Sequence, residues 1–433
     1  MKKVITTHIF LAVIALFSFT ACKKDYGNLN SATIESFSNN PTAAELNNLV
    51  SGTESGMRNA IAFYLDDAGI IGREMYHFSG SEPRYVKDLL GADSSVLSGS
   101  NFYIATPWAA RYRVIKNCNI LLQAVAASSN ITAEEKLGYT GFAKMVKAYQ
   151  LLLNLNLTSA NGIRVDVADP DHLGPIVNNN DGLTAIASLL DSASTDFSTA
   201  NVSFPLAGFG SFNNATGLLQ VTKALSARVA LYQQRWSDAL TYLNGSFFGL
   251  DKDFYLGVSH VFGTGSGDQL NPAFIPQNQT GEVRVAHPSY AADIEASDYR
   301  IGKATLRAAT ASLNGLTSNR DVWVYTSSTA SIPIIRNEEL ILIYAEANIQ
   351  TNNLGEGVKA LNTIRNKHNL ANYSGAVTQA ALLDEMLKQR RYSLYFEGHR
   401  WIDLRRYNRL SELPIDRTGD DVWTEFPLPV TEQ

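Results

Sequence analysis

The sequence is poor in cysteine, in charged residues and in long apolar runs. Only 2 of its 433 residues are cysteines, and 18% are charged. After the N-terminal segment no apolar run approaches the ~20 residues that a membrane-spanning helix needs, so we expect none there. If Cys22 carries a lipid, as its context indicates below, Cys118 has no partner for an internal disulfide. Its apparently helical surroundings favour a small buried side chain, with a reactive thiol as the alternative.

The motifs of common hydrolases and metal sites are also missing. The sequence has no H-E-x-x-H, G-x-S-x-G, Walker A or Cys/His cluster. Its close acidic pairs in loop regions are Asp66 with Asp67 and Asp251 with Asp253. Neighbouring carboxylates on one segment point apart, so they are poor partners across a glycosidic bond. We therefore expect no catalysis, no cofactor and no metal site, and keep a surface glycosidase as the lowest alternative.

The balance of charge is acidic. The formal net charge is -5, and loss of residues 1–21 makes it -7, because 34 Lys and Arg then face 41 Asp and Glu. An acidic chain is a poor partner for nucleic acid, so we expect no nucleic-acid binding. The low charged content, with plentiful Asn, Ser, Thr and Gly, suits a polar surface that meets neutral ligands.

The N-terminus reads as a lipoprotein signal peptide over residues 1–21. Lys2 and Lys3 precede an apolar run from Ile9 to Phe19, and Thr20-Ala21-Cys22 resembles a lipobox. We expect lipidation of Cys22 and a lipid-anchored tether over residues 22–40, which holds the protein to a membrane without spanning it. The alternative is a plain secretory signal that is cleaved near Ala21.

Helical periodicity alternates with two long loop-rich excursions. Apolar spacing predicts helices over residues 41–64, 108–123, 133–157, 183–197, 218–234 and 236–243. Several neighbours resemble tetratricopeptide-like pairs, with small residues at the seam and Trp236 opening a second helix. The excursions, about 65–107 and 245–331, are rich in aromatic residues. Alternation at Val322, Trp323, Val324 and Tyr325 predicts a short strand.

Residues 331–407 form the most informative stretch. Apolar residues at i, i+3, i+4 and i+7 predict three helices, the last running through LLDEMLKQRRYSLYFEGHRWIDLRRY. Charged residues lie on or beside the apolar faces, which predicts a structural ion network. Helical spacing lets Arg400 reach Glu397 and Asp403. The members expected in this network are Arg336, Glu339, Arg365, Arg390, Glu397, Arg400 and Asp403.

Three motifs in this stretch resemble a known family. R-x-x-E-x-x-L-x-x-A-E-A begins at Arg336, A-x-N-x-x-R begins at Ala360, and R-R-x-x-L-x-F-E-G-x-R-W-x-D-L-R-R begins at Arg390. Together they are similar to the C-terminal signature of the SusD/RagB family of outer-membrane nutrient-binding lipoproteins. The sequence departs from it at Gln389 and Ser393, where the family usually has acidic residues.

The resemblance implies an all-α fold, a SusD-like helical scaffold with tetratricopeptide-like helix pairs and two long loop-rich excursions that carry a little β. It implies one SusD-like domain over residues 41–433, with parts at about 41–245, 245–331 and 331–433. It also implies an outer-membrane protein facing the cell exterior, which passes a captured oligosaccharide to a SusC-like TonB-dependent transporter. A peptide-binding uptake lipoprotein is the alternative, and a scaffold protein without a small ligand is a further one.

The ligand site is expected on the two excursions, because family members bind there and because aromatic faces and planar polar groups suit sugars. The residue types alone do not select the contacts, since aromatic side chains also pack in cores. The candidate ligand-binding residues are Asp67, Arg73, Tyr76, Arg84, Tyr85, Tyr290, Tyr299, Trp323 and Tyr325.

Overall fold

The computed structural model describes residues 39–432. The expected signal peptide, the lipidated Cys22 and nearly all of the expected tether lie outside these residues. Among residues 39–432 no helix is both long and apolar enough to cross a membrane. The α-helices of this part are α3 (Ala43–Gly56), α4 (Ile61–Ile71), α5 (Phe102–Ala127), α6 (Ala133–Thr158), α7 (Asn179–Phe197), α8 (Ala215–Tyr232), α9 (Trp236–Asn244), α10 (Pro288–Asp293), α11 (Asn337–Gln350), α12 (Leu354–Lys367), α13 (Gln379–Ser393) and α14 (Arg400–Arg406).

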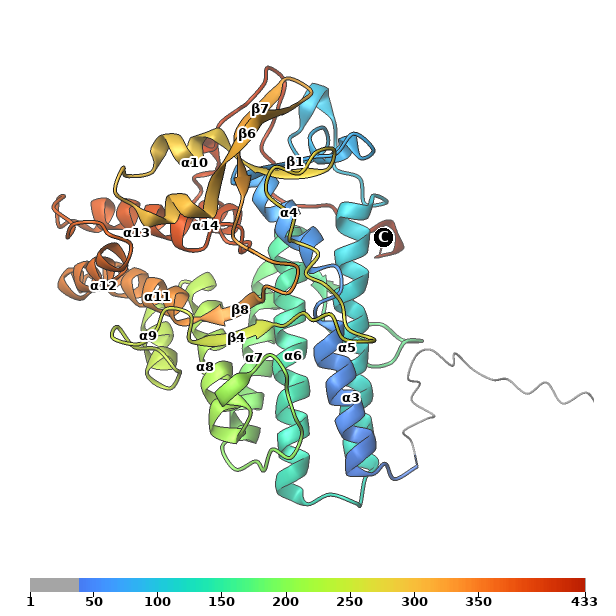
Figure 1. The fold of residues 1–433 in the computed structure, drawn as a ribbon. Helices are drawn as coiled ribbons and strands as arrows, with labels where there is room; N and C mark the ends of the chain where they lie inside the picture. Colours follow the sequence, from blue (N-terminus) through green and yellow to red (C-terminus); the bar gives the residue numbers. More distant parts are fainter. Residues whose placement is uncertain (1–38, 433) are drawn as a thin grey trace, which may run out of the picture.

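The helices form one scaffold in which each packs on the next. The series α5, α6, α7, α8 and α9 packs in chain order, and α9 contacts α11, which also packs on α12 and α13 (Figure 1). Helix α6 begins where its sequence dictates. The Thr132 side chain accepts a hydrogen bond from the Glu135 backbone N–H (3.2 Å), and Glu135 accepts one from the Thr132 N–H (2.8 Å). The prediction of a mostly helical scaffold is confirmed.

Short strands join the two excursions to each other. The strands are β1 (Met75–Phe78), β2 (Ile163–Arg164), β3 (Ile176–Val177), β4 (Gly257–His260), β5 (Val283–Ala286), β6 (Ala304–Leu313), β7 (Leu316–Val322) and β8 (Ile332–Arg336). One sheet has the order β1-β5-β7-β6, and β1 runs antiparallel to β5. Since β1 belongs to the first excursion and β5 to the second, this sheet binds them into one unit (Figure 1).

The predicted helix over residues 41–64 is two helices. The chain breaks between α3 and α4, where Ala60 has a φ of 56°. Arg111 of α5 donates hydrogen bonds to the carbonyls of Met57 (2.9 Å) and Asn59, which the break frees from helical bonding. A distant side chain therefore stabilises the break, and nothing local in the sequence announces it.

One strand prediction also needs correction. The strand predicted at residues 322–325 is wrong, because β7 ends at Val322. Strand β7 forms a hairpin with β6 instead, and the turn places both Asn314 (φ 49°) and Gly315 (φ 80°) in the left-handed region. An Asn-Gly pair is a strong hairpin signal, since these residues tolerate positive φ.

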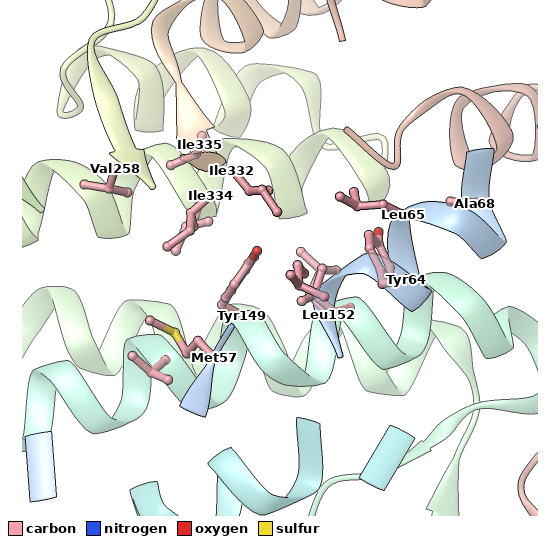
Figure 2. Packing of buried hydrophobic residues seen from close by; sticks show 14 of the residues in the cluster. Met57, Tyr64, Leu65, Ala68, Tyr149, Leu152, Val258, Ile332, Ile334 and Ile335 are labelled. Atoms are coloured by element: carbon pink, nitrogen blue, oxygen red, sulfur yellow. The ribbon is translucent and has the colours of Figure 1, made fainter. Parts of the chain in front are cut away.

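One part of the core lies where the β4–β8 strand pair covers the scaffold helices. Figure 2 shows Ile334 of β8 and Tyr149 of α6 pointing toward one another, with Met57 close by. Ile335 is 1% exposed and Val258 of β4 is also 1% exposed. Cys118 lies in this core with 0% exposure, as predicted, and burial raises the pKa of its thiol to about 12.

Candidate ligand-binding surface

A buried polar cluster locks the first excursion to the second. Asp66 of α4 accepts two hydrogen bonds of 2.7 Å from Arg284 of β5. His77, the cross-strand partner of Arg284, lies 3.2 Å from Asp66 and 2.9 Å from Glu282. Burial opposes ionisation of Asp66, but Arg284 and His77 lower its pKa to about 2. The two excursions therefore meet through a charged, largely water-free contact.

Six of the nine candidate ligand residues lie beneath the surface. They are 0–7% exposed, so in this conformation they support the surface rather than form it: Asp67, Arg73, Tyr76, Tyr85, Tyr290 and Tyr325. Their polar groups explain their positions. The Tyr290 hydroxyl donates to the Arg300 carbonyl (2.7 Å), and the Tyr325 hydroxyl donates to the Phe396 carbonyl (3.1 Å).

Arg73 and Asp67 are also held inside the protein. Arg73 donates to the carbonyls of Pro414 (3.1 Å) and Asp421 (2.7 Å), so it ties the first excursion to the C-terminal segment. Burial, and then its neighbour Asp66, raise the pKa of Asp67 well above its ordinary value. The Asp66–Asp67 pair, at 1% and 0% exposure, offers no accessible carboxylates for a glycosidase.

The other three candidates are accessible. Tyr299 is 69% exposed, while Arg84 and Trp323 are partly exposed. Arg84 lies with its guanidinium carbon 4.8 Å from the ring centroid of Phe102 and donates to Glu82 (2.5 Å). Tyr299 and Trp323 belong to the second excursion, whereas Arg84 belongs to the first.

Three residues with accessible rings are connected through hydrogen bonds to the C-terminal end of α13. The backbone N–H of Trp323 donates to the carbonyl of Lys303 (2.7 Å), which ends the short helical turn that begins at Tyr299. The Lys303 amino group in turn donates to the carbonyls of Tyr392 (3.1 Å) and Ser393 (2.6 Å). Trp323 and Tyr299 are therefore both tied to the last residues of α13.

The third ring belongs to Tyr255, which sequence reasoning did not single out. It is 76% exposed, and its centroid lies 5.7 Å from the guanidinium carbon of Arg336. Arg336 donates to the same Ser393 carbonyl as Lys303, at 2.7 Å. We name the rings of Tyr255, Tyr299 and Trp323 the aromatic surface. The only signal for Tyr255 was its place in an aromatic-rich excursion.

Buried charged groups hold the segments that carry these rings. Arg336 pairs with Glu397 (2.8 Å) and with Glu338, and Glu338 lies 2.6 Å from His368. Burial lowers the pKa of Lys303 to about 8, so its amino group remains mostly charged at pH 7. Buried ion pairs thus support residues with accessible aromatic faces, and such faces are chemically suited to stack on the C–H faces of polyhydroxylated ligands.

The ion network of the C-terminal stretch has different pairs from those expected. Asp403 accepts from Arg390 (2.6 Å) and Arg406 (3.0 Å), while Glu397 pairs with Arg336. Arg400 forms neither expected pair. The single helix predicted through Glu397 and Arg400 is broken, because α13 ends at Ser393 and Gly398 has a φ of 80°. Without helical backbone between Glu397 and Arg400, spacing by three does not bring their side chains together. Asp403 lies on α14 with Arg400, but Arg390 and Arg406 take its carboxylate instead.

The remaining network members have partners that no local pattern shows. Glu339 pairs with Arg228 of α8 (2.6 Å), and Arg365 pairs with Glu295 (3.0 Å) and Glu385. Arg228 is separated from Glu339 by 111 residues. In the described part of the chain no group of three or more His, Cys, Asp and Glu side chains could hold a metal ion.

Comparisons with known proteins found one similar family model and several solved structures with a similar fold. The model of the SusD family matches residues 294–424. No curated protein matches the sequence. A SusD superfamily protein from Bacteroides vulgatus has a TM-score of 0.68 at 14% identity, covering 90% of this chain and 96% of its own. One from Parabacteroides distasonis has a TM-score of 0.69 at 16% identity, covering 90% and 97%.

A third similar structure contains a ligand. It is surface glycan-binding protein A from Bacteroides thetaiotaomicron in complex with laminarihexaose, with a TM-score of 0.71 at 12% identity, covering 90% of this chain and 97% of its own. At such identities the likeness to solved structures establishes a shared fold.

Proposed function

We propose that the chain is a member of the SusD family, whose model matches residues 294–424, and that it captures an oligosaccharide outside the cell and delivers it, without catalysis, to a TonB-dependent outer-membrane transporter. Membership of the family supports glycan binding in general. The aromatic surface is the observation that carries the proposal for this chain. Its rings belong to residues of the second excursion that hydrogen bonds connect to the C-terminal end of α13.

The physical chemistry of sugars supports this surface as the ligand site. A pyranose ring presents an apolar C–H face, which stacks on Tyr or Trp, and a rim of hydroxyl groups. Tyr255 and Tyr299 are 76% and 69% exposed, so stacking would cover apolar area that otherwise faces water. Lys303 and Arg336 fix the segments that carry these rings, because both donate to the Ser393 carbonyl. Arg84, on the first excursion, is proposed as a further contact.

Binding of purified residues 24–433 to a panel of polysaccharides and oligopeptides tests the proposal. Affinity electrophoresis identifies the ligand, calorimetry measures Kd, and an assay for new reducing ends detects hydrolysis. We expect Tyr255→Ala and Trp323→Ala each to weaken glycan binding about tenfold, or ~1.4 kcal/mol, because each removes one stacking face. Tyr242→Ala, which removes a partly exposed ring on the scaffold helix α9, is the control and should bind normally.

Each other outcome leads to a different conclusion. Binding to peptides alone would replace the glycan by a peptide ligand. Release of reducing sugar would refute the non-catalytic role. Glycan binding that both alanine variants retain in full would refute the aromatic surface as the site, while leaving glycan capture in place.

The anchor and the transporter belong to the same proposal. We propose that Cys22 carries the lipid and that the protein faces the cell exterior at the outer membrane. Cys22→Ser should prevent labelling by a radioactive fatty acid and release the protein from the membrane fraction. Copurification of a TonB-dependent transporter with the tagged wild-type protein would support the partner, and its absence under crosslinking would contradict it.

A further inference from the structure

The structure contains a polar cleft near the C-terminal end of the chain. Its volume is about 480 Å³, and α10, α13, α14 and the segment at residues 409–414 form its walls. It shares no lining residue with the aromatic surface. The cations in its wall are Lys388, Arg391, Arg400 and Arg409.

Three of these cations already have carboxylate partners. Arg391 pairs with Asp293 (2.8 Å), Arg409 pairs with Asp384 (2.6 Å) and Glu412, and Lys388 pairs with Glu295 (2.7 Å). Asp403, which also lines the cleft, is held by Arg390 and Arg406 from the protein side. The acidic side chains in the wall are therefore engaged and leave the fourth cation uncompensated.

Arg400 is that fourth cation. Among residues 39–432 no group forms an ion pair or a hydrogen bond with its guanidinium, and its Nε is completely covered. Burial, and next the like charge of Arg391, lower the pKa of Arg400 to about 9, so it is still a cation at pH 7. Burial raises the pKa of its neighbour Glu74 to about 8, so that carboxyl is mostly protonated and supplies little counter-charge.

An uncompensated arginine in the wall of a cleft is costly unless an anion meets it. A guanidinium presents parallel N–H donors that match the two oxygens of a carboxylate, sulfate or phosphate. Arg391 adds a second cation in the same wall, and its Nη2 donates to the Ser289 hydroxyl (2.7 Å), which also lines the cleft. We propose that this cleft binds one oxyanion group, with Arg400 as its main ligand and Arg391 beside it.

Such a site would serve an acidic ligand, for example the uronate or sulfate group of a charged sugar, or a free inorganic anion. The proposal is independent of the aromatic surface. If glycan binding there failed, an anion would still be expected in the cleft.

Calorimetry of residues 24–433 with sodium glucuronate, sodium sulfate and sodium phosphate tests this, with sodium chloride holding the ionic strength constant. Glucuronamide, which lacks the charge, is the ligand control. We expect saturable binding of at least one anion, and at least a tenfold loss in Arg400→Gln and in Arg391→Gln. Arg235→Gln, which breaks an exposed pair with Asp238 on α9, should bind the anion normally.

The outcomes separate the sources of the anion. Glucuronate binding without glucuronamide binding assigns the site to acidic sugars, and binding of sulfate or phosphate alone assigns it to inorganic anions. If no anion binds above the sodium chloride control, the proposal is wrong. It is equally wrong if Arg400→Gln or Arg391→Gln is folded, as judged by circular dichroism, and binds with wild-type affinity.

Discussion

Replacement of Arg336 by methionine tests which arginine holds the C-terminal network together. Arg336 donates two hydrogen bonds to Glu397 (3.1 and 2.8 Å) and one to the Ser393 carbonyl (2.7 Å), and it also pairs with Glu338. The side chains of Arg336 and Glu338 are 4% and 3% exposed, and that of Glu397 is 8% exposed. Methionine keeps the volume of the stem but leaves both carboxylates without this cation.

Removing one partner of a buried ion pair costs roughly 3–5 kcal/mol. For a chain of this size that free energy corresponds to a fall in Tm of about 5 °C, because the unfolding entropy scales with length. Arg400→Met should leave Tm nearly unchanged or raise it slightly, since no carboxylate depends on Arg400. Differential scanning calorimetry and urea unfolding at pH 7 measure both variants.

A double variant tests how much of the lost stability comes from the Arg336–Glu397 pair. Arg336→Met with Glu397→Gln should recover part of the loss, because the second change removes a carboxylate that the first left unpaired. The reasoning fails if Arg336→Met has the Tm of the wild type, or if Arg400→Met lowers Tm more than Arg336→Met does. The second result would restore the expectation that Arg400 clamps the network.

Three further predictions concern single side chains. The pKa of Glu74 in the folded protein, about 8, lies above its ordinary 4.5. Its contribution to stability is therefore full below pH 4.5 and is lost, by a few kcal/mol, as pH rises to 8. Glu74→Gln should flatten this decline in the free energy of unfolding, measured by urea titrations across the range. Gly398→Ala should lower the free energy of unfolding by about 2 kcal/mol or more, because φ is +80° and the new Cβ would lie 2.6 Å from the Tyr64 ring. An unchanged midpoint of urea unfolding would contradict this. Cys118, whose thiol is buried, should react with an aromatic disulfide reagent only at the rate of unfolding, and fast reaction in native buffer would refute its burial.

Local information was enough to place most helices. Helix α6 begins at its predicted residue, because Thr132 and Glu135 satisfy the first N–H groups within one turn of chain. The Asn314-Gly315 turn was equally local, and its pair of positive φ angles was readable from the sequence although it was missed. Burial of Cys118 followed from its apolar, helical neighbours.

Contacts between distant residues decided what local pattern could not. Helical spacing pointed to Arg400 as the clamp, but Gly398 breaks the helix and Arg336 takes Glu397 from another element. Exposure was decided in the same way, since Tyr325 and Tyr255 lie in the same excursion, yet one is 5% and the other 76% exposed. Sequence by itself predicted the helical scaffold and the two excursions and pointed to a resemblance to the SusD/RagB family, because these depend on spacing within a few turns of chain. Only the tertiary structure decided which charges pair and which rings face solvent, because burial is a property of surfaces brought together from opposite ends of the chain.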